Sequence, residues 1–398
     1  MTSKTATGPH AKGPLRGVRV IDLTAMVFGP YATQIMADMG ADVIKIEPPE
    51  GDPTRYISVA PAPGLAGVYV NVNRGKRSVV LDLKTEAGKA ALRKLIESAD
   101  VFIHSMRAAA VKKLGFDYEA VAAINPGIVY TNCYGYGHRG PERDRAAYDD
   151  TIQAECGLVA LQQQLTGTPA YLGTIVADKV SGLTALYATM MALFHKARTG
   201  EGQEVEVAMF ETMASFVLVE HANGAMFSPP LSEAFYPRVV APNRKPYATK
   251  DGYVSALIYN DKHWVAFVGA VRPEWATPDM VSLEVRAAQI DRIYGLLAET
   301  FLTRTTAEWI ELLNGLAIPA APLRTPAELF DDPHLAAVGF FETVESDQGP
   351  VRFPGVPTWF SRTPGAVAGP TRTLGADTEE VLSALDLPNA AYNIDCLK

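Results

Sequence analysis

One carboxylate stands in unusual company. Residues 173–182 read GTIVADKVSG, so Asp178 follows an apolar run and precedes a long apolar segment. Carboxylates are seldom placed among apolar side chains unless they are paired, cap a helix or take part in chemistry. Asp178 is therefore paired, caps the following helix or has a functional role, and this stretch leaves the three interpretations open.

A basic run is the second group of residues that could do chemistry. NRGKRS at 73–78 is followed by Lys84, Arg107, Lys112 and Lys113, in a chain whose formal charge is −8. Cations gathered near the strand ends of an acidic protein are typical of a local anion site. A solvated face with helix-capping charges is the alternative, and the run by itself favours that alternative.

Tyr148 and Asp149 form a third candidate group, in the string AAYDDTIQAECG. Asp149 or Asp150 could cap a helix by accepting backbone amide hydrogen bonds. A place in a binding site fits the pair as well, and the string leaves both interpretations open.

The elements that must position these residues alternate between strands and helices. Strands are expected at 18–23, 41–47, 78–84, 101–105, 128–134 and 203–209, and helices at 29–40 and 86–99. This alternation is typical of an α/β fold with a parallel sheet. A helix from Asp178 to about Thr199 is apolar on nearly every face, which predicts that it is buried.

The composition of the sequence changes after about residue 225. The proline-rich stretch 228–253 indicates a linker into a second, smaller and more helical unit. This unit is expected to hold a strand at 253–259 and helices near 262–271, 284–302 and 306–315, the last opened by the capping box TTAE. A final helix at 377–385 has no obvious partner nearby.

Composition excludes several classes of function. The surplus of acidic residues argues against a general nucleic-acid or anionic-membrane binder. The three cysteines, Cys133, Cys156 and Cys396, are far apart and indicate neither a disulfide framework nor a zinc site. The segment MTSKTATGPHAKGP has no apolar core of a signal peptide, and no apolar run is long enough to span a membrane. We therefore expect a cytoplasmic protein without a metal.

The opening strand, helix and strand invite a dinucleotide-binding interpretation, with Glu47 as the acid that would hold a ribose. However, the turn TAMVFGP offers only Gly29, whereas a pyrophosphate needs several glycines so that backbone amides can approach it. The sequence also lacks a GxSxG elbow, an HExxH motif, a P-loop and a CxxC pair. A nicotinamide-dependent oxidoreductase is therefore disfavoured.

Long blocks of the sequence carry a family resemblance. In order they are LTAMVFGPYATQIMADMGADVIKIEPPEGDPTR, NRGKRSVVLDLKTEAGKAALRKLIESADVFIHSMR, LGFDYEAVAAINPGIVYTNCYGYG and ADKVSGLTALYATMMALFHKARTGEGQEVEVAMFE. Together with tail segments such as DDPHLAAVGFFETVE, they cover nearly the whole chain. The sequence resembles the family III CoA-transferases, the group that contains formyl-CoA and carnitine CoA-transferases and the α-methylacyl-CoA racemases.

The resemblance implies an architecture. It is an α/β fold in which a Rossmann-like large domain is formed by both chain ends, with a smaller inserted α+β domain and an interlocked homodimer. The expected ranges are 1–225 for the first part of the large CoA-binding domain, 226–330 for the inserted domain with its linkers, and 331–398 for the return to the large domain. The return would give the helix at 377–385 its partner.

The resemblance also implies a mechanism, because the family's catalytic aspartate matches Asp178. That carboxylate would attack the thioester of a donor acyl-CoA to give a mixed anhydride, and the CoA thiolate would convert it to an aspartyl-CoA thioester. A free acid would then attack, and the cycle would reverse. Helix amides would keep Asp178 ionised, and apolar neighbours would exclude water. CoA thioesters are thus substrates, and no cofactor is bound permanently.

CoA contacts are carried over at matching positions only. They are Leu81, Asp82, Leu83 and Lys84 at the adenine, Ser105, Met106 and Arg107 in the next loop, Lys113 at the phosphates, and Tyr148 beside the thioester. Val27 occupies the position of a glutamine in the formyl-CoA enzyme, Pro48 that of an arginine and Ala146 that of a lysine. These departures keep CoA binding but disfavour formyl or oxalyl substrates.

Three functions stay open, with CoA transfer between carboxylic acids favoured. A 2-methylacyl-CoA racemase would need a second acid–base group, yet the racemase histidine is matched by Tyr148, and a tyrosine hydroxyl is a weak base at neutral pH. In a non-catalytic acyl-CoA-binding protein, Asp178 would only cap its helix. Arg238, Arg244 and Lys245 are candidate partners of an acceptor carboxylate, or else exposed linker charges.

Overall fold

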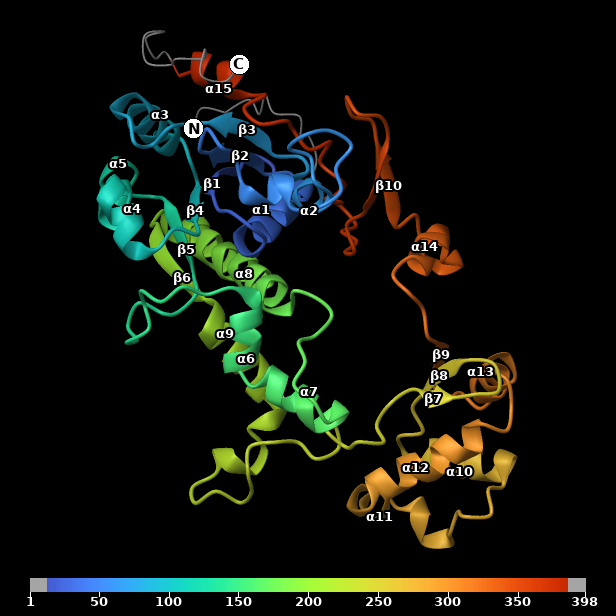
Figure 1. Ribbon diagram of the computed structural model, residues 1–398. Helices are drawn as coiled ribbons and strands as arrows, with labels where there is room; N and C mark the ends of the chain where they lie inside the picture. Colours follow the sequence, from blue (N-terminus) through green and yellow to red (C-terminus); the bar gives the residue numbers. More distant parts are fainter. Residues whose placement is uncertain (1–12, 386–398) are drawn as a thin grey trace. The chain divides into compact units, whose positions relative to one another are not determined.

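The computed structural model describes residues 13–385 of the chain, which form two compact units. The first unit comprises the described residues up to Cys156, the segment Gly173–Phe216 and the described residues from His334 onward. The second unit comprises Gly157–Leu172 and Val217–Pro333 (Figure 1). Cys396 and most of the segment MTSKTATGPHAKGP lie outside the described residues.

A six-stranded parallel sheet forms the centre of the first unit. In spatial order its strands are β3 (Arg77–Val80), β2 (Asp42–Glu47), β1 (Arg19–Leu23), β4 (Val101–His104), β5 (Val129–Tyr134) and β6 (Gln203–Ala208). The strand order reverses between β1 and β4. In open parallel sheets, ligands bind beside such a switch point, at the carboxyl ends of the strands.

Helices cover both faces of this sheet. The helices of this unit are α1 (Phe28–Asp38), α2 (Gly67–Asn73), α3 (Glu86–Glu97), α4 (Ala108–Leu114), α5 (Tyr118–Ile124), α6 (Asp149–Glu155), α8 (Val176–Thr199), α14 (Pro333–Ala337) and α15 (Thr378–Ser383), and α9 (Met209–His221) has residues in both units. Not all of them lie on the sheet, since α6 packs against α8 and α2 against α1. Apolar side chains of α3, α5 and α15 share one core with strands β1 to β5. Helices α1 and α8 pack against each other, and α8 also contacts β5 and β6.

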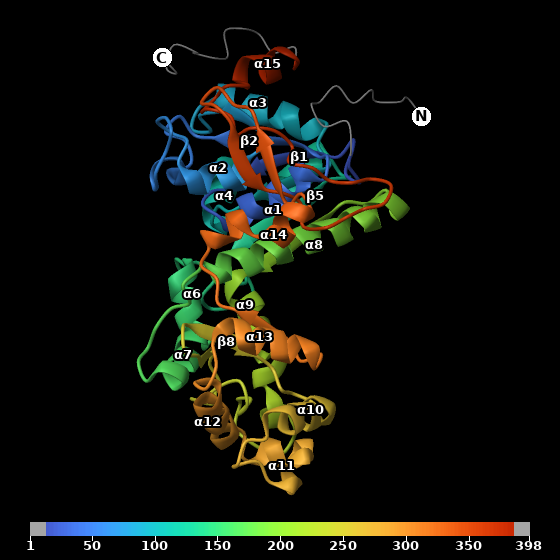
Figure 2. The ribbon, with the colours of Figure 1, turned by 90° about the vertical axis from the view of Figure 1, so that its right-hand side faces the viewer.

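The C-terminal helix α15 does have a partner. Val381 and Leu382 enter the core of the first unit, and Figures 1 and 2 both show α15 beside α3. The backbone N–H of Ser78 donates to the Asp377 carboxylate at 2.8 Å, and that of Val80 donates to Thr378 Oγ1 at 3.0 Å. These bonds cover the free edge of β3. The first unit also holds the antiparallel pair β10 (Phe341–Val344) and β11 (Val351–Pro354).

Most of the predicted strands are confirmed, but three expectations differ from the structure. β3 ends at Val80, because Asp82 forms a turn with Lys84 and Thr85 caps α3. The helix expected at 284–302 is interrupted at Gln289. Helix α8 is not buried on all sides, since its Leu183, Tyr187, Met191 and Phe194 side chains are 45–67% exposed.

The basic run fits neither of its two interpretations. Arg74 pairs with Asp38 at 2.6 Å, Lys76 with Asp22 at 3.0 Å and Arg77 with Asp42 at 2.6 Å. Arg74 and Lys76 are buried. The run therefore supplies internal counter-charges to carboxylates on β1, α1 and β2, and forms neither an anion site nor a solvated face.

The second unit has its own core. A three-stranded antiparallel sheet of β7 (Tyr247–Ala248), β8 (Tyr253–Ala256) and β9 (Ala320–Pro322) is accompanied by the helices α7 (Leu158–Thr166), α10 (Asp261–Val271), α11 (Leu283–Ala288), α12 (Ile290–Phe301) and α13 (Thr306–Gly315). Phe267, Phe301 and Trp309 form a buried aromatic cluster. The predicted capping box is confirmed, since Thr305 and Glu308 exchange hydrogen bonds at the start of α13. No helix of residues 13–385 is long and apolar enough to cross a membrane.

Candidate active site

Two cavities lie at the switch point of the sheet. The first, the Asp178 cavity, has a volume of about 270 Å³ and is lined by Ala25, Met26, Phe28, Ser105, Arg107, Cys133, Tyr134, Gly135, Arg143, Arg145, Ala146, Ala147, Tyr148, Asp178 and Met209. The second, the edge cavity, has a volume of about 380 Å³. It is lined by Leu23, Ala25, Ile46, Glu47, Pro48, Pro49, Glu50, Leu81, Asp82, Leu83, Lys84, Ser105, Met106 and Leu114. Ala25 and Ser105 belong to both, so the cavities adjoin.

The structure brings most of the predicted site residues to these cavities. Leu81, Asp82, Leu83, Lys84, Ser105 and Met106 line the edge cavity, while Ser105, Arg107, Tyr148 and Asp178 line the Asp178 cavity. Val27 and Lys113 line neither. Val27 is the buried N-cap residue of α1, and Lys113 lies exposed in the last turn of α4.

Asp178 does not cap its helix. Helix α8 begins at Val176 with Ile175 at the N-cap position, so Asp178 is the third helical residue. The backbone N–H of Asp178 donates to Asp149 Oδ1 at 3.0 Å, and the backbone N–H of Phe28 donates to the Asp178 carboxylate. The capping interpretation is therefore wrong, and the carboxylate is free to face the cavity.

The pKa of Asp178 is raised to about 7. Burial is the main cause, the negative charge of Asp149 adds to it, and the hydrogen bond from Phe28 opposes both. The sequence led us to expect that helix amides keep this carboxylate ionised. Only one amide does so, and a titration near neutral pH results. A carboxylate with such a pKa is typical of a functional site.

Asp149, which the sequence left ambiguous, is a buried neighbour of Asp178. One of its carboxylate oxygens accepts the Asp178 N–H, and the other accepts from Gln153 Nε2. Tyr148 is the N-cap residue of α6, and its side chain is largely exposed at the cavity. Asp149 thus fixes the first turn of α8 and also contributes a like charge.

Helices α1 and α8 approach each other closely at Gly182, one turn beyond Asp178. A Cβ atom on Gly182 would lie 2.8 Å from the carbonyl oxygen of Phe28 and 3.1 Å from the ring of Tyr31. The distance of 2.8 Å to a backbone oxygen is too short for a Cβ atom, so a side chain here would force the two helices apart. The missing side chain therefore lets the first residue of α1 reach Asp178.

The turn between β1 and α1 forms one wall of both cavities. Met26 has a φ of 67°, a left-handed conformation that costs a residue with a side chain about 1–3 kcal/mol. Lys45 Nζ donates to the carbonyl oxygen of Thr24 at 2.8 Å, and the N–H of Ala25 donates to Ser105 Oγ at 2.9 Å. Asp52 accepts from the N–H of Met26 and pairs with Lys45. These contacts hold the turn in place.

The residues behind the dinucleotide interpretation have structural roles. A Cβ atom on Gly29 would lie 2.3 Å from Thr24 Cγ2, so the turn needs a glycine for packing. The Glu47 carboxylate accepts from Arg55, Tyr69 and Ser78 and from the N–H of Asp52, and it is buried. A carboxylate so fully used cannot hold a ribose.

His104 orders the turn that joins the two cavities, a role with no signal in the sequence. Its Nδ1 accepts from the N–H of Met106 at 3.1 Å, so Nε2 carries the proton and contacts the Tyr130 hydroxyl at 2.9 Å. Tyr130 in turn donates to the carbonyl oxygen of Phe116 at 2.8 Å. Burial lowers the pKa of His104 to about 4, which keeps the ring neutral.

Comparison with known proteins identifies the family. Residues 15–378 match the model of CoA-transferase family III. The chain belongs to this family. It is 33% identical to the succinate–glutarate CoA-transferase of Agrobacterium fabrum, over 95% of this chain and 97% of that protein. It is also 33% identical to the acetyl-CoA:oxalate CoA-transferase of Acetobacter aceti, over 91% and 92% of the two chains.

A solved structure agrees with this assignment. The crystal structure of a CaiB/BaiF family protein from Brucella suis superimposes with a TM-score of 0.80 at 30% identity, covering 94% of this chain and 100% of that one. The protein is thus a family III CoA-transferase, an enzyme whose substrates are CoA thioesters. The predicted α/β fold with a parallel sheet is confirmed, and the structure also contains smaller antiparallel sheets.

Gly182→Ala tests the close approach of α1 and α8. The added Cβ must push Phe28 away from α8, so we expect the free energy of unfolding in urea to fall by about 1–3 kcal/mol. CoA-transferase activity should also fall, and by more than the smaller fraction of folded protein explains, because Asp178 loses the hydrogen bond from the Phe28 N–H.

Gly269→Ala is the matched control. Gly269 also lies inside a helix, α10, and nothing lies within 4 Å of its added Cβ. Alanine is the better helix former by about 1 kcal/mol, so this variant should be slightly more stable and fully active. Equal behaviour of the two variants would contradict the role of Gly182.

Proposed function

We propose that Asp178 is the covalent nucleophile of CoA transfer between an acyl-CoA thioester and a free carboxylic acid. The observation that carries the proposal is its carboxylate, which lies in a cavity, is held by the N–H of Phe28 and has a pKa of about 7. Such a group is ionised often enough to attack a thioester, yet it is poorly solvated and so more reactive than a surface carboxylate.

The proposed reaction consists of successive acyl transfers through Asp178, and it returns the carboxylate to its starting state. Asp178 attacks the donor thioester carbonyl, the C–S bond breaks, and an aspartyl anhydride and CoA thiolate form. The thiolate attacks the aspartyl carbonyl, which releases the donor acid and leaves aspartyl-CoA. The acceptor acid displaces the thiolate to form a new anhydride, and the thiolate then takes the acceptor acyl group. Burial raises the pKa of the nearby Cys133 thiol, which therefore stays protonated and does not compete.

We propose that CoA lies across both cavities. The apolar wall of the edge cavity, with Leu81, Leu83 and Met106, suits the adenine, and the thioester arm would pass Ala25 and Ser105 towards Asp178. Lys84 and Arg107 are exposed on the walls of the two cavities and form no ion pair within residues 13–385. They are the cations best placed for the phosphates, whereas Lys113 would have to reach in from outside.

The exposed face of α8 supports the proposed homodimer. Leu183, Tyr187 and Met191 follow one another at four-residue spacing, and each is 45–67% exposed. A row of large apolar side chains on the surface marks an interaction site. In an interlocked dimer, as the family implies, the first unit would be the CoA-binding domain and the second unit the inserted domain. The limits of these two units differ from the expected ranges 1–225, 226–330 and 331–398, because Gly157–Leu172 and Val217–Pro333 form the second unit.

The dimer is tested by dilution. Interlinked chains cannot separate without unfolding, so sedimentation at nanomolar protein should still show only dimers. Exchange of subunits between tagged and untagged protein at low micromolar concentration would contradict an interlocked assembly.

Asp178→Asn tests the nucleophile. The amide keeps the shape of the side chain but cannot attack a thioester, so CoA exchange should fall by at least about 10⁴-fold while CoA binding persists. Intact-protein mass spectrometry after mixing with an acyl-CoA should show a covalent adduct in the wild type and none in the variant. Asp150→Asn, at an exposed neighbouring acid, is the control and should keep full activity.

Two outcomes would contradict the proposal. Undiminished turnover in Asp178→Asn would exclude a covalent aspartate. Rapid deuterium uptake at the α-carbon of a 2-methylacyl-CoA, lost in Asp178→Ala and accompanied by no CoA exchange with any acid, would make racemisation the better interpretation.

The raised pKa predicts a pH profile. Protonation below pH 7 removes the nucleophile, so kcat/KM for the acyl-CoA donor should rise with pH, with a midpoint near 7, and level off above about pH 8. Asp149→Asn removes a like charge, so the midpoint should move to lower pH. Asp150→Asn should leave it in place. A profile that is flat between pH 5 and 8 would show that Asp178 does not control the rate.

A further inference from the structure

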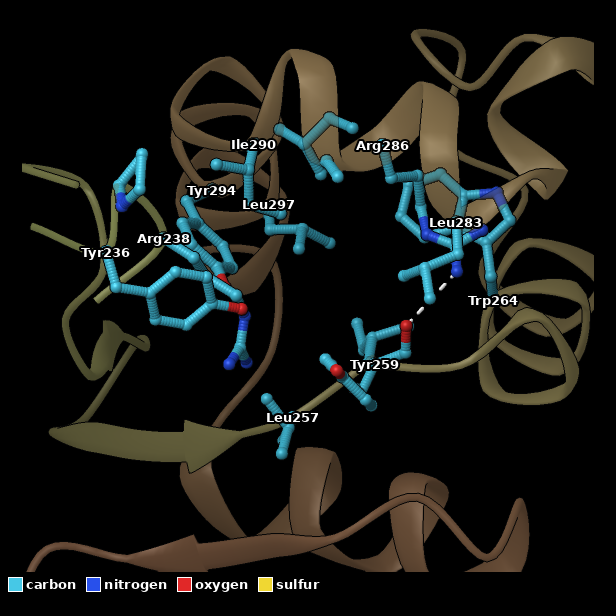
Figure 3. A pocket seen from close by; sticks show the side chains of 14 residues that line it. Tyr236, Arg238, Leu257, Tyr259, Trp264, Leu283, Arg286, Ile290, Tyr294 and Leu297 are labelled. Atoms are coloured by element: carbon cyan, nitrogen blue, oxygen red, sulfur yellow. Dashed lines mark hydrogen bonds between the residues drawn. The ribbon is translucent and has the colours of Figure 1, made fainter. Parts of the chain in front are cut away.

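The second unit contains a cavity of its own, of about 320 Å³, and all of its lining residues belong to that unit (Figure 3). Its floor is made by Trp264, Ile293, Tyr294 and Leu297, which are at most 9% exposed. Leu257, Tyr259 and Leu283 are 43–44% exposed and form its rim. This is a mostly apolar and aromatic hollow of the size that binds small molecules.

Arg286 pins the walls of this cavity. Its guanidinium donates to the carbonyl oxygens of Met280 at 2.9 Å, Val281 at 2.5 Å and Tyr259 at 3.1 Å, and it pairs with Asp261 at 2.8 Å. These bonds tie the chain after β8 to the start of α11. Both terminal nitrogens of Arg286 already donate to protein oxygens, and its charge is paired with Asp261. We therefore assign Arg286 a structural role in the wall and not a role in ligand binding.

Arg238 is the other cation of the cavity, and its charge is not used. Figure 3 shows Tyr236 and Arg238 at one end of the cavity and Trp264 and Arg286 at the other. The Arg238 guanidinium lies 4.8 Å from the centre of the Tyr259 ring, and it forms no ion pair within the described residues. A guanidinium stays charged in proteins, so this end of an apolar cavity carries an uncompensated positive charge.

The three cations of YPRVVAPNRK, which are Arg238, Arg244 and Lys245, therefore have different surroundings. Only Arg238 lines the cavity. Arg244 and Lys245 are exposed, and the Arg244 guanidinium donates to the carbonyl oxygen of Val239 at 3.4 Å. For these two the interpretation as exposed linker charges holds, and Arg244 becomes a natural control for Arg238.

We propose that this cavity binds a monocarboxylate with an aromatic or branched apolar body. The carboxylate would form a charge-assisted, two-pronged hydrogen bond with Arg238, and the apolar body would lie among Tyr236, Leu257, Tyr259 and Tyr294. A neutral apolar ligand would leave the guanidinium without a partner, and a polyphosphate would find one cation and apolar walls. The site does not depend on Asp178 chemistry.

The test is calorimetric titration of the full chain, carried out in the Asp178→Asn background so that no turnover interferes. The probe is 3-phenylpropanoate, and one molecule should bind per chain. 3-Phenylpropanamide should bind at least tenfold more weakly than 3-phenylpropanoate because it lacks the negative charge. Acetate should also bind at least tenfold more weakly, because it lacks the apolar body.

Arg238→Met should weaken 3-phenylpropanoate binding at least tenfold, whereas Arg244→Met should leave it unchanged. Leu283→Trp at the rim fills the mouth without removing charge, and it should block binding while the circular dichroism spectrum stays that of the parent. Equal affinity in Arg238→Met and Arg244→Met, or no binding at millimolar concentration, would overturn the proposal. Because binding is measured without the nucleophile, failure of the Asp178 mechanism would not change these results.

Discussion

A set of buried charges under the turn after β1 holds the site together. Lys45 bridges the Thr24 carbonyl and Asp52, while Lys76 pairs with Asp22, and all four charged side chains are buried. Despite burial, the two lysines lower the pKa of Asp22 to about 2. Removing one partner of a buried ion pair lowers the free energy of unfolding by about 3–5 kcal/mol, because the other charge is left buried without a counter-charge. Each charge of this set is therefore needed by its neighbours. The strained turn at Met26 persists because this network fixes it on both sides.

The geometry of the candidate active site depends on that turn. Because the turn is fixed, α1 begins at a set position, and the glycine contact at 182 brings the Phe28 amide to Asp178. Burial next to Asp149 then makes the Asp178 carboxyl group hard to ionise, because its negative charge is poorly solvated there. In the proposed mechanism, the same desolvation would favour attack of this carboxylate on a thioester. A surface aspartate would be better stabilised and less reactive.

The second unit shows the opposite arrangement of charge. In the first unit each buried cation has its carboxylate, as Arg55 has Glu47 and Arg74 has Asp38. In the second unit Arg286 is similarly satisfied by Asp261 and three carbonyl oxygens, but Arg238 lies at an apolar cavity with only a tyrosine ring against it. Such a contrast is informative, because a half-buried cation beside apolar walls is better stabilised when a ligand supplies an anion.

The sequence by itself determined the parallel sheet and the capping box at Thr305, because strand periodicity and capping residues are local signals. It also singled out Asp178 as a carboxylate among apolar residues, and its role stays a prediction. It also carried the family resemblance. Only the tertiary structure decided that NRGKRS neutralises buried carboxylates, that α8 leaves Leu183 and Tyr187 exposed, and that Asp149 raises the pKa of Asp178. These features depend on which distant segments meet, because charge pairing, burial and the close approach at Gly182 exist only once the helices have packed.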